Sequence, residues 1–408
     1  YYLYKIDRKS VESIQWRWMR VAVQGAYDDK WKELEEPERL KEVIDTYDML
    51  SLKYAIHATP TCVNAGHKNS QMESCFCVDM GDSMDAIAFA KTTILMGSKA
   101  NGGFGLYCGR IRHSRVANRG LTKGVPGVLQ TFNTDIVYAD QLGSRPGAMT
   151  AQLPIWHTDI ETFIIMKNPN VCPKAILCEN LHYTVCIPDL FYKRLNEKGK
   201  WSHFCPRKTQ ILYAKLKGLD YRVSEVVDKC PSLCDFWGQE FEEFYLQCEN
   251  AGIADKVIDA PVVMTNLCQE ITQYTKPNEI TPTCDLATVN LPSFVIKNCD
   301  SNTVHKYTID WKKIGTITRQ LTRNLDRIID RTSGILPNEG QLYCESMLSH
   351  EDPKVREMAS TFLQWVRKDP THTARQRNRA FGIGVMGFAS MCALLGIEYG
   401  SKEAYDLG

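Results

Sequence analysis

Three side chains that could do chemistry alternate over five residues near the middle of the chain: Asn266, Cys268 and Glu270. Successive side chains of an extended backbone point to opposite faces, so these three would look the same way. An amide that orients, a thiol that reacts and a carboxylate that takes a proton form a catalytic set. The alternative is a structural strand with a buried cysteine, since free cysteine is commonly a small buried hydrophobe.

A glycine-rich stretch, Gly102-Gly103-Phe104-Gly105, could bring the backbone close to a ligand. Lys99 precedes it, and Arg110 and Arg112 follow it. Glycines flanked by cations favour an anion or nucleotide site. A flexible turn is the alternative.

A second glycine pattern at 382–387 matches the dinucleotide fingerprint G-x-G-x-x-G. A Rossmann fingerprint opens a βαβ unit and is followed by an acidic residue about 20 positions later. The sequence stops at about that distance, which leaves no room for the second strand. We therefore expect a tight turn from a strand into a helix, and reject an NAD-dependent oxidoreductase.

Composition excludes several classes of protein. The net charge of +1, from 49 basic and 48 acidic residues, gives no nucleic-acid footprint. No signal-peptide pattern or apolar run of about 18 residues is present, so we expect no membrane partner. The 16 cysteines are scattered, which predicts a reducing cytoplasm. Cys230 and Cys234 lack a matching second pair, and no metal site is expected.

Local patterns predict alternating helices and strands. A helix begins at the Asp82-Ser83 cap and continues to about residue 97. Other helices are predicted at 37–54, 125–139, 159–166, 189–195, 241–250 and 311–331, with strands at 74–78, 155–157, 183–188, 266–270 and 284–291. Residues 196–240 are expected to form an irregular surface excursion. The alternation predicts α/β architecture with right-handed crossovers.

The order of these motifs resembles the large subunit of class I ribonucleotide reductases of the eukaryotic and viral type. The resemblance runs from about residue 20 to the end of the chain. It is carried by Thr59-Pro60-Thr61, Asn64-Ala65-Gly66, Ser74-Cys75-Phe76, Asp82-Ser83, Ser98-Lys99, Gly102-Gly103-Phe104-Gly105, Arg145-Pro146-Gly147-Ala148, Trp156-His157-Thr158-Asp159-Ile160, Asn266-Leu267-Cys268-Gln269-Glu270, Cys284-Asp285-Leu286-Ala287 and the glycine pattern at 382–387.

The resemblance implies a ten-stranded α/β barrel with a central finger loop. A helical N-terminal segment at 1–56 would precede the barrel at 57–408. The family's later barrel strands, its diphosphate loop and its C-terminal cysteines are not found in this sequence, nor is its N-terminal ATP-cone. We therefore expect a chain truncated at both ends, whose barrel is incomplete and which does not turn over alone.

The resemblance also implies reduction of ribonucleoside diphosphates to 2′-deoxyribonucleoside diphosphates, a step in DNA precursor synthesis. Cys268 matches the cysteine that becomes a thiyl radical and takes the 3′-hydrogen. Glu270 matches the base for the 3′-hydroxyl proton, and Asn266 the amide that hydrogen-bonds the ribose. Cys75 and Cys284 match the redox pair that delivers two electrons by forming a disulfide.

Other matched positions bind ligands. Thr59, Ser74 and Leu267 match substrate-contacting positions, as do Asn266 and Glu270.

Asp82, Ser83, Lys99 and Arg112 match the allosteric specificity site for a deoxynucleoside triphosphate or ATP. The loop at 140–148 matches the element that carries the effector signal to the substrate.

The implied partners follow the same family. We expect no covalently bound cofactor in this chain, and a radical supplied by a metal-containing small subunit. Thioredoxin or glutaredoxin would re-reduce the disulfide, and the effector site implies a homodimer. The alternatives are a non-catalytic, nucleotide-binding regulatory relative and a fragment of a split large subunit.

Overall fold

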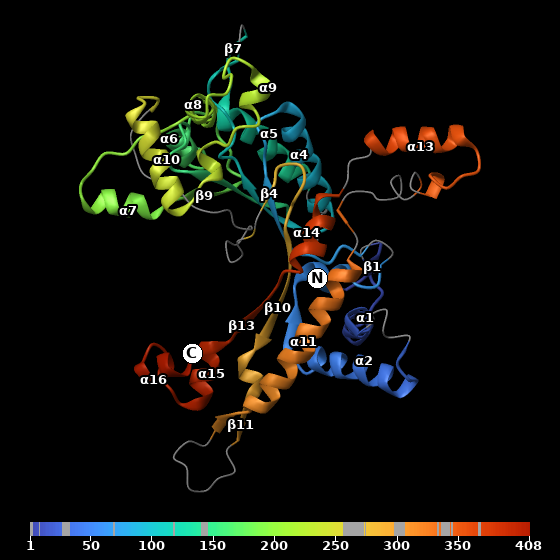
Figure 1. The fold of residues 1–408 in the computed structure, drawn as a ribbon. Helices are drawn as coiled ribbons and strands as arrows, with labels where there is room; N and C mark the ends of the chain where they lie inside the picture. Colours follow the sequence, from blue (N-terminus) through green and yellow to red (C-terminus); the bar gives the residue numbers. More distant parts are fainter. Residues whose placement is uncertain are drawn as a thin grey trace. The chain divides into compact units, whose positions relative to one another are not determined.

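The computed structural model describes residues 3–7, 9–26, 33–67, 70–116, 119–139, 146–255, 273, 275–297, 307–332, 334–335, 343, 346–365 and 369–408. The chain forms two compact units (Figure 1). Unit 1 comprises Tyr1–Ser74, Thr283–Ile335 and Ala374–Gly408. Unit 2 comprises Cys75–Pro282 and Leu336–Thr373.

Unit 2 is built on four parallel strands whose order in space follows their order in the sequence. They are β4 (Cys75–Asp79), β5 (Gly103–Tyr107), β8 (Ala148–Pro154) and β9 (His182–Cys186). Between them run α4 (Met84–Lys99), α5 (Gly124–Tyr138) and α6 (Ile160–Ile165). Parallel strands wound in one direction, with helices in the crossovers, are typical of α/β barrels.

The glycine-rich stretch packs inside unit 2. A Cβ at Gly97 of α4 would collide with the ring of Phe104, and one at Gly102 would lie 2.6 Å from the ring of Phe76. Phe76 and Phe104 stack with ring centroids 5.0 Å apart. The glycines let α4 approach the sheet, and Gly103–Tyr107 is a buried strand. The flexible-turn alternative for this stretch is therefore wrong, and the anion-site interpretation stays a prediction.

The rest of unit 2 is mostly helical and has a core of its own. Its elements are β6 (Arg115–Val116), β7 (Gly120–Leu121), α7 (Asp189–Asn196), α8 (Pro206–Leu216), α9 (Ser224–Val227), η2 (Leu233–Asp235), α10 (Gly238–Asn250) and α13 (Pro353–Trp365). Helix α8 contradicts the expected irregular excursion at 196–240. Pro206 begins α8, and Leu212 joins an aromatic cluster around Tyr245.

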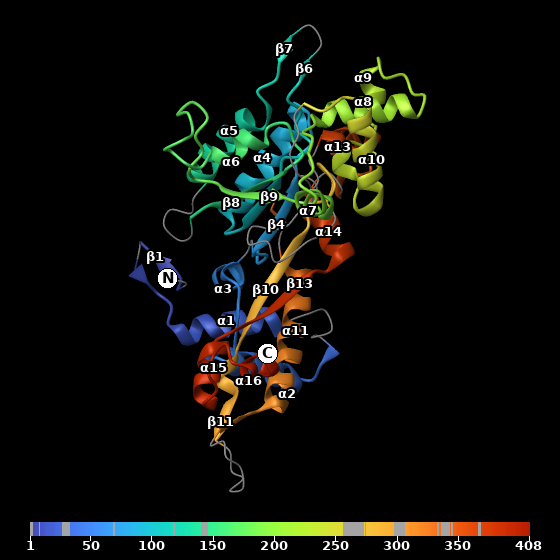
Figure 2. The same ribbon diagram turned by 90° about the vertical axis from the view of Figure 1, so that its left-hand side faces the viewer.

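Unit 1 is organised around strand β10 (Thr283–Asn290). β3 (Ala55–His57) pairs with it antiparallel, and β13 (Phe381–Met386) pairs with it parallel. The remaining elements are β1 (Lys5–Ile6), β2 (Lys9–Ser10), α1 (Ile14–Ala26), α2 (Glu36–Ser51), α3 (Thr59–Asn64), η3 (Leu291–Phe294), β11 (Val295–Lys297), β12 (Tyr307–Ile309), α11 (Trp311–Arg331), α15 (Phe388–Leu395) and α16 (Lys402–Leu407), with α14 (Pro370–Asn378) belonging to unit 1 from Ala374 onward. Figure 2 shows α11 beside β10 from a second side.

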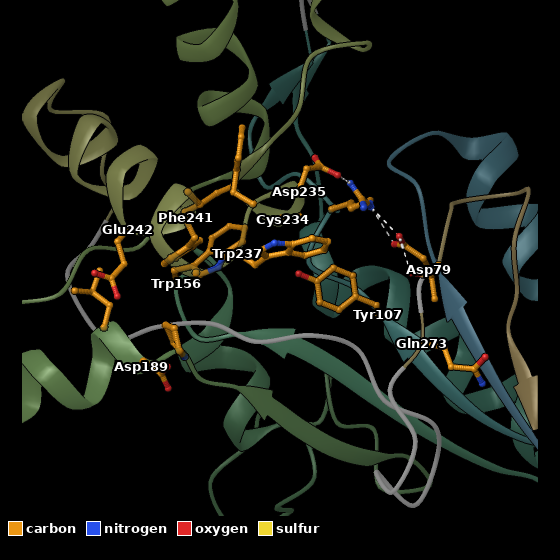
Figure 3. Close-up of a pocket in the computed structure, with 17 residues that line it drawn as sticks. Asp79, Tyr107, Trp156, Asp189, Cys234, Asp235, Trp237, Phe241, Glu242 and Gln273 are labelled. Atoms are coloured by element: carbon orange, nitrogen blue, oxygen red, sulfur yellow. Dashed lines mark hydrogen bonds and ion pairs between the residues drawn. The ribbon is translucent and has the colours of Figure 1, made fainter. Parts of the chain in front are cut away.

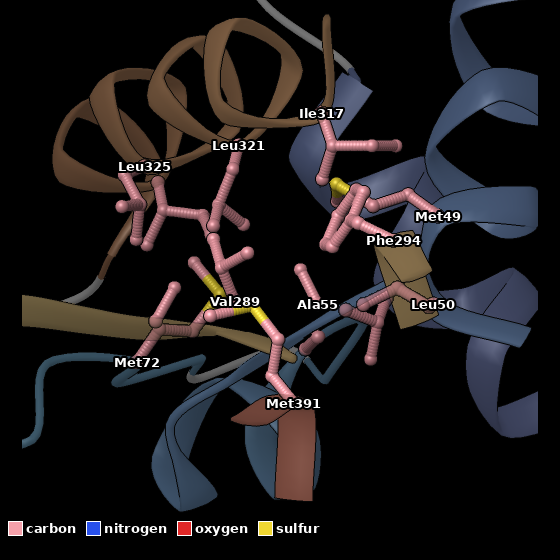
Figure 4. Packing of buried hydrophobic residues seen from close by; sticks show 14 of the residues in the cluster. Met49, Leu50, Ala55, Met72, Val289, Phe294, Ile317, Leu321, Leu325 and Met391 are labelled. Carbon is pink, nitrogen blue, oxygen red and sulfur yellow. The ribbon is translucent and has the colours of Figure 1, made fainter. Parts of the chain in front are cut away.

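The core of unit 1 lies between α11, α2 and β10. Figure 4 shows Leu321 and Leu325 of α11 turned towards Val289, with Met49 and Phe294 beside them. Apolar residues repeat at helical spacing along α11, so one face of this helix is buried and the other stays polar. This pattern explains why α11 has the bounds that the sequence predicted.

Most predicted elements are confirmed within one to three residues, and the α/β class with N-terminal helices is confirmed. The strand predicted at 155–157 is wrong, because β8 ends at Pro154 and the His157 amide closes a turn onto the Pro154 carbonyl. Among the described residues, neither set of strands closes into a barrel. The predicted strand at 266–270 lies outside the described residues.

The glycine pattern at 382–387 is a strand-to-helix turn, as predicted. β13 ends at Met386, and α15 begins at Phe388. Gly387 between them has φ +79°, and a Cβ there would lie 2.6 Å from Cδ of Pro292. Only glycine fits both the backbone conformation and the space.

Within the part of the chain that the structure describes, every helix is too short or too polar to cross a membrane.

Candidate active site and effector site

A predicted substrate-contacting residue and a predicted redox cysteine of unit 1 meet where Ser74 contacts the start of β10. The Ser74 amide donates to the Cys284 carbonyl at 3.2 Å, and its hydroxyl donates to the same oxygen at 3.3 Å. Both residues are buried. Cys75 follows Ser74 directly and is the buried first residue of β4. The structure therefore joins Ser74 to one of the two predicted redox cysteines.

A buried charged network lies beside this contact. The Glu73 side chain is 1% exposed and accepts from the Thr283 hydroxyl at 2.6 Å. The second carboxylate oxygen of Glu73, Oε2, lies 3.2 Å from Nη1 of Arg375 and 3.4 Å from the side-chain nitrogen Nε2 of Gln71. Sequence reasoning missed these residues. The neighbouring residues Ser70, Gln71 and Ser74 are polar, so the sequence gave no local signal that the Glu73 carboxylate is buried.

Thr59 is the first residue of α3, and this helix is tied to the segment before Ser74. The Thr61 hydroxyl donates to the Met72 carbonyl at 3.1 Å, and the side-chain amide of Asn64 donates to the backbone carbonyl of Gln71 at 2.6 Å. Two predicted substrate positions, Thr59 and Ser74, thus come from neighbouring segments of unit 1.

The predicted catalytic residues of the finger loop lie outside the described residues. These are Asn266, Leu267, Cys268 and Glu270. Their roles stay predictions.

Three predicted effector residues meet at the first turn of α4. Ser83 caps this helix by accepting from the Ala86 amide at 3.0 Å. Asp82 forms an ion pair with Arg112 and also accepts from the Arg112 amide at 2.9 Å. Burial raises the pKa of Asp82 above its usual value, although the hydrogen bonds and charge of Arg112 oppose the shift.

Lys99 lies at the other end of α4, with its side chain exposed. The helix has 16 residues, so its ends are about 22 Å apart at 1.5 Å per residue. Within one chain the structure does not bring Lys99 to Asp82. Ser98 donates to the Ala139 carbonyl at 3.2 Å, and a Cβ on Gly147 would lie 3.0 Å from its hydroxyl. Ser98 therefore contacts Ala139, which directly precedes the 140–148 loop, and lies close to Gly147 near the end of that loop. Lys99 directly follows Ser98 in the sequence.

Unit 2 contains a cavity of about 510 Å³ at the carboxyl ends of its strands (Figure 3). Sequence reasoning did not predict it. Its lining includes Asp79, Tyr107, Arg110, Trp156, Asp189, Cys234, Asp235, Trp237, Phe241 and Glu242. The carboxyl ends of parallel strands are the usual place for binding sites in α/β proteins.

Charge and burial limit what this cavity can do. Nε of Arg110 lies 3.0 Å from Asp79, and Nη1 lies 2.6 Å from Asp235. Arg110 is the one cation among the described lining residues, and these carboxylates already neutralise it. Burial raises the pKa of the Cys234 thiol to about 12, so it is not a thiolate nucleophile at neutral pH. The cavity offers aromatic walls and carboxylates, not a phosphate site.

No group of three or more histidine, cysteine or acidic residues is arranged for a metal ion within the described part of the chain.

Sequential parallel strands with helices in the crossovers define an α/β class of protein. The family model for the "Ribonucleotide reductase, barrel domain" matches residues 73–264 and 259–408, and the model for its all-alpha domain matches residues 1–70. The chain therefore belongs to the ribonucleotide reductase large-subunit family. The proposed domain boundary at 56/57 stays a prediction.

Several curated relatives match over the whole chain. The ribonucleoside-diphosphate reductase large chain of Neurospora crassa is 29% identical, and the large subunit of Variola virus is 31% identical. The large subunit of Arabidopsis thaliana is 29% identical. The alignments cover 100% of this chain but only 40%, 48% and 48% of those relatives. The chain thus spans less than half the length of these proteins.

Proposed function

We propose that this chain is the part of a ribonucleoside-diphosphate reductase large subunit that carries the thiol chemistry and the specificity site. The observation that carries the proposal is the double hydrogen bond from Ser74 to the Cys284 carbonyl, directly before Cys75 in the sequence. Membership of the family supports the activity, since its relatives are named as ribonucleoside-diphosphate reductases.

The proposed reaction is a two-electron reduction of the ribose. A thiyl radical on Cys268 takes the 3′-hydrogen of the substrate, and Glu270 takes the proton of the 3′-hydroxyl while Asn266 holds the sugar. One thiol of Cys75 and Cys284 protonates the 2′-hydroxyl, which leaves as water. The two thiols lose two electrons and two protons in total and become a disulfide; one hydrogen leaves in the water and the other is added to C2′. Glu270 returns the proton to the 3′-oxygen, and Cys268 returns the 3′-hydrogen and is again a thiyl radical.

The proposed binding partners follow from this reaction. Thr59, Ser74 and Leu267 contact the ribonucleoside diphosphate. A metal-containing small subunit supplies the radical, and thioredoxin or glutaredoxin reduces the disulfide. The many buried cysteines are consistent with a cytoplasmic protein.

A homodimer would complete the effector site. Asp82 and Lys99 lie at opposite ends of α4, but a two-fold axis across this helix would place one chain's first turn beside its partner's last turn. Met84 on the first turn of α4 and Tyr138 on the last turn of α5 are both exposed, and such an interface would cover them. This geometry supports effector binding between two chains by Asp82, Ser83, Arg112 and Lys99.

Thiol mapping of the folded chain tests the proposal. The chain is treated with an oxidant or with dithiothreitol, its free thiols are alkylated, and disulfides are identified by mass spectrometry. We expect a reversible Cys75–Cys284 disulfide that spares Cys268. If Cys75 and Cys284 never pair, the chemistry proposed here is wrong and a nucleotide-binding regulatory relative is the better description.

A further inference from the structure

Glu73 holds together two segments that are far apart in the sequence. Its carboxylate accepts from Thr283 across 210 residues and pairs with Arg375 across 302 residues. Arg375 is 7% exposed and Glu73 is 1% exposed. A buried charge is retained only where it is paired and hydrogen-bonded, so this network exists because the surrounding fold supplies every partner.

The network lies one residue away from the cysteine contact on both segments. Thr283 directly precedes Cys284, and Glu73 directly precedes Ser74. The Thr283–Glu73 bond of 2.6 Å therefore sits next to the pair of bonds from Ser74 to the Cys284 carbonyl. Three hydrogen bonds at two adjacent positions fix the register of these segments.

The chemistry of a disulfide makes this register important. Two thiols can bridge only when their Cα atoms lie about 4.4–6.8 Å apart with a narrow range of dihedral angles. Fixing two reacting groups in place raises their effective concentration. A slip or loosening at Thr283 would move Cys284 directly, because the two residues are adjacent in β10.

We propose that Glu73 is a positioning residue for the redox cysteines, acting through Thr283 and Arg375. It fixes the register in which Cys75 and Cys284 exchange between dithiol and disulfide, and it acts by holding these segments in place. This inference rests on the proposed function, because it needs Cys75 and Cys284 to be the pair that is oxidised.

The test is the equilibrium between the full chain and dithiothreitol. Oxidised dithiothreitol takes two electrons and two protons from Cys75 and Cys284 as their disulfide forms. Mass spectrometry of the trapped mixture gives the fraction with this disulfide at each redox ratio, and Cys75→Ser supplies the baseline. We expect Thr283→Val to lower the equilibrium constant about tenfold, which corresponds to about 30 mV for a two-electron couple.

Two matched variants separate positioning from general stability. Thr283→Ser keeps the hydroxyl and should restore the wild-type equilibrium. Glu12→Gln removes another well-paired carboxylate of unit 1, which lies 3.0 Å from Arg20, and should leave the equilibrium unchanged. Glu73→Gln should shift the equilibrium in the same direction as Thr283→Val, because it removes the negative charge that pairs with Arg375.

The outcomes distinguish the two proposals. If the wild-type chain forms no Cys75–Cys284 disulfide, the proposed function fails. If the wild-type chain forms it and Thr283→Val matches wild type, the positioning role of Glu73 is wrong while the function stands. Equal shifts in Thr283→Val, Thr283→Ser and Glu12→Gln would also contradict it, because they would report only general destabilisation.

Discussion

Each unit buries a carboxylate against an arginine, but the two pairs have different surroundings. In unit 1, Glu73 is enclosed with Arg375, Thr283 and Gln71. In unit 2, the Asp79–Arg110 pair borders a cavity, and Arg110 extends to Asp235.

This difference shows that a buried ion pair can have either of two structural roles. Where both carboxylate oxygens meet protein donors, as in Glu73, the pair specifies how distant segments fit together. Where the pair borders a cavity, as around Arg110, it shapes a wall and retains a second partner. The enclosed pair should therefore respond more strongly to substitution than the pair at the cavity.

Glu73→Ala should produce the largest effect. It removes the carboxylate that pairs with the buried Arg375 charge, and breaking a buried pair costs about 3–5 kcal/mol. Hydrogen exchange resolves the two units, and we expect protection to fall in β10 and β3 while β5 and β8 keep theirs. A loss below about 1 kcal/mol would remove the contrast between the pairs.

The buried His57 of unit 1 should make the stability of this unit depend on pH. Burial lowers its pKa from 6.5 to about 4, and both ring nitrogens lack hydrogen-bond partners among the described residues. The folded state binds the proton less readily, so stability is complete above pH 6.5 and falls by about 3 kcal/mol as pH drops to about 4.

Denaturation midpoints between pH 4 and 7 check this prediction. His57→Phe should remove much of the decrease in stability that unit 1 shows at acidic pH. His157 in unit 2 is the comparison: burial also lowers its pKa, but Asp159 and the Ile111 carbonyl oppose the shift. An acid loss that persists unchanged in His57→Phe would assign it to other groups.

Asp79→Asn should cost less than Glu73→Ala, about 1.5–3 kcal/mol, because Arg110 keeps its bond to Asp235.

Burial raises the pKa of Asp79 even though Arg110 opposes the shift. A raised carboxyl pKa gives stability that is present below the unfolded pKa and lost as pH rises through the folded one. The free energy of unfolding measured in urea should therefore decrease as pH rises in the wild type, and this decrease should be absent in Asp79→Asn.

Trp237→Ala should have the smallest effect on stability. This side chain lines the cavity but is 69% exposed, and exposed substitutions usually stay within about 0.5 kcal/mol. Trp156 lines the same cavity and is buried, so Trp156→Ala should cost about 3–5 kcal/mol. Thermal unfolding of both variants checks the pair, and equal losses would show that Trp237 supports the core.

Local signals predicted the elements that carry the sites. Ser83 was recognised as a cap, and α11 was predicted with its observed bounds, because caps and apolar periodicity depend on neighbouring residues. The strand start at Ser74-Cys75 and the strand at Cys284 were also predicted. Helix α8 was missed, because its polar sequence gave a weak periodic signal.

The sequence by itself determined the family, the α/β class and the chemical types at the expected sites, since motifs and periodic patterns are written in consecutive residues. Only the tertiary structure decided that Glu73 meets Thr283 and Arg375, and that Gly102 packs against Phe76. These facts depend on strand register and on which helix covers which strand. Such contacts join residues tens to hundreds of positions apart, and no local pattern encodes them.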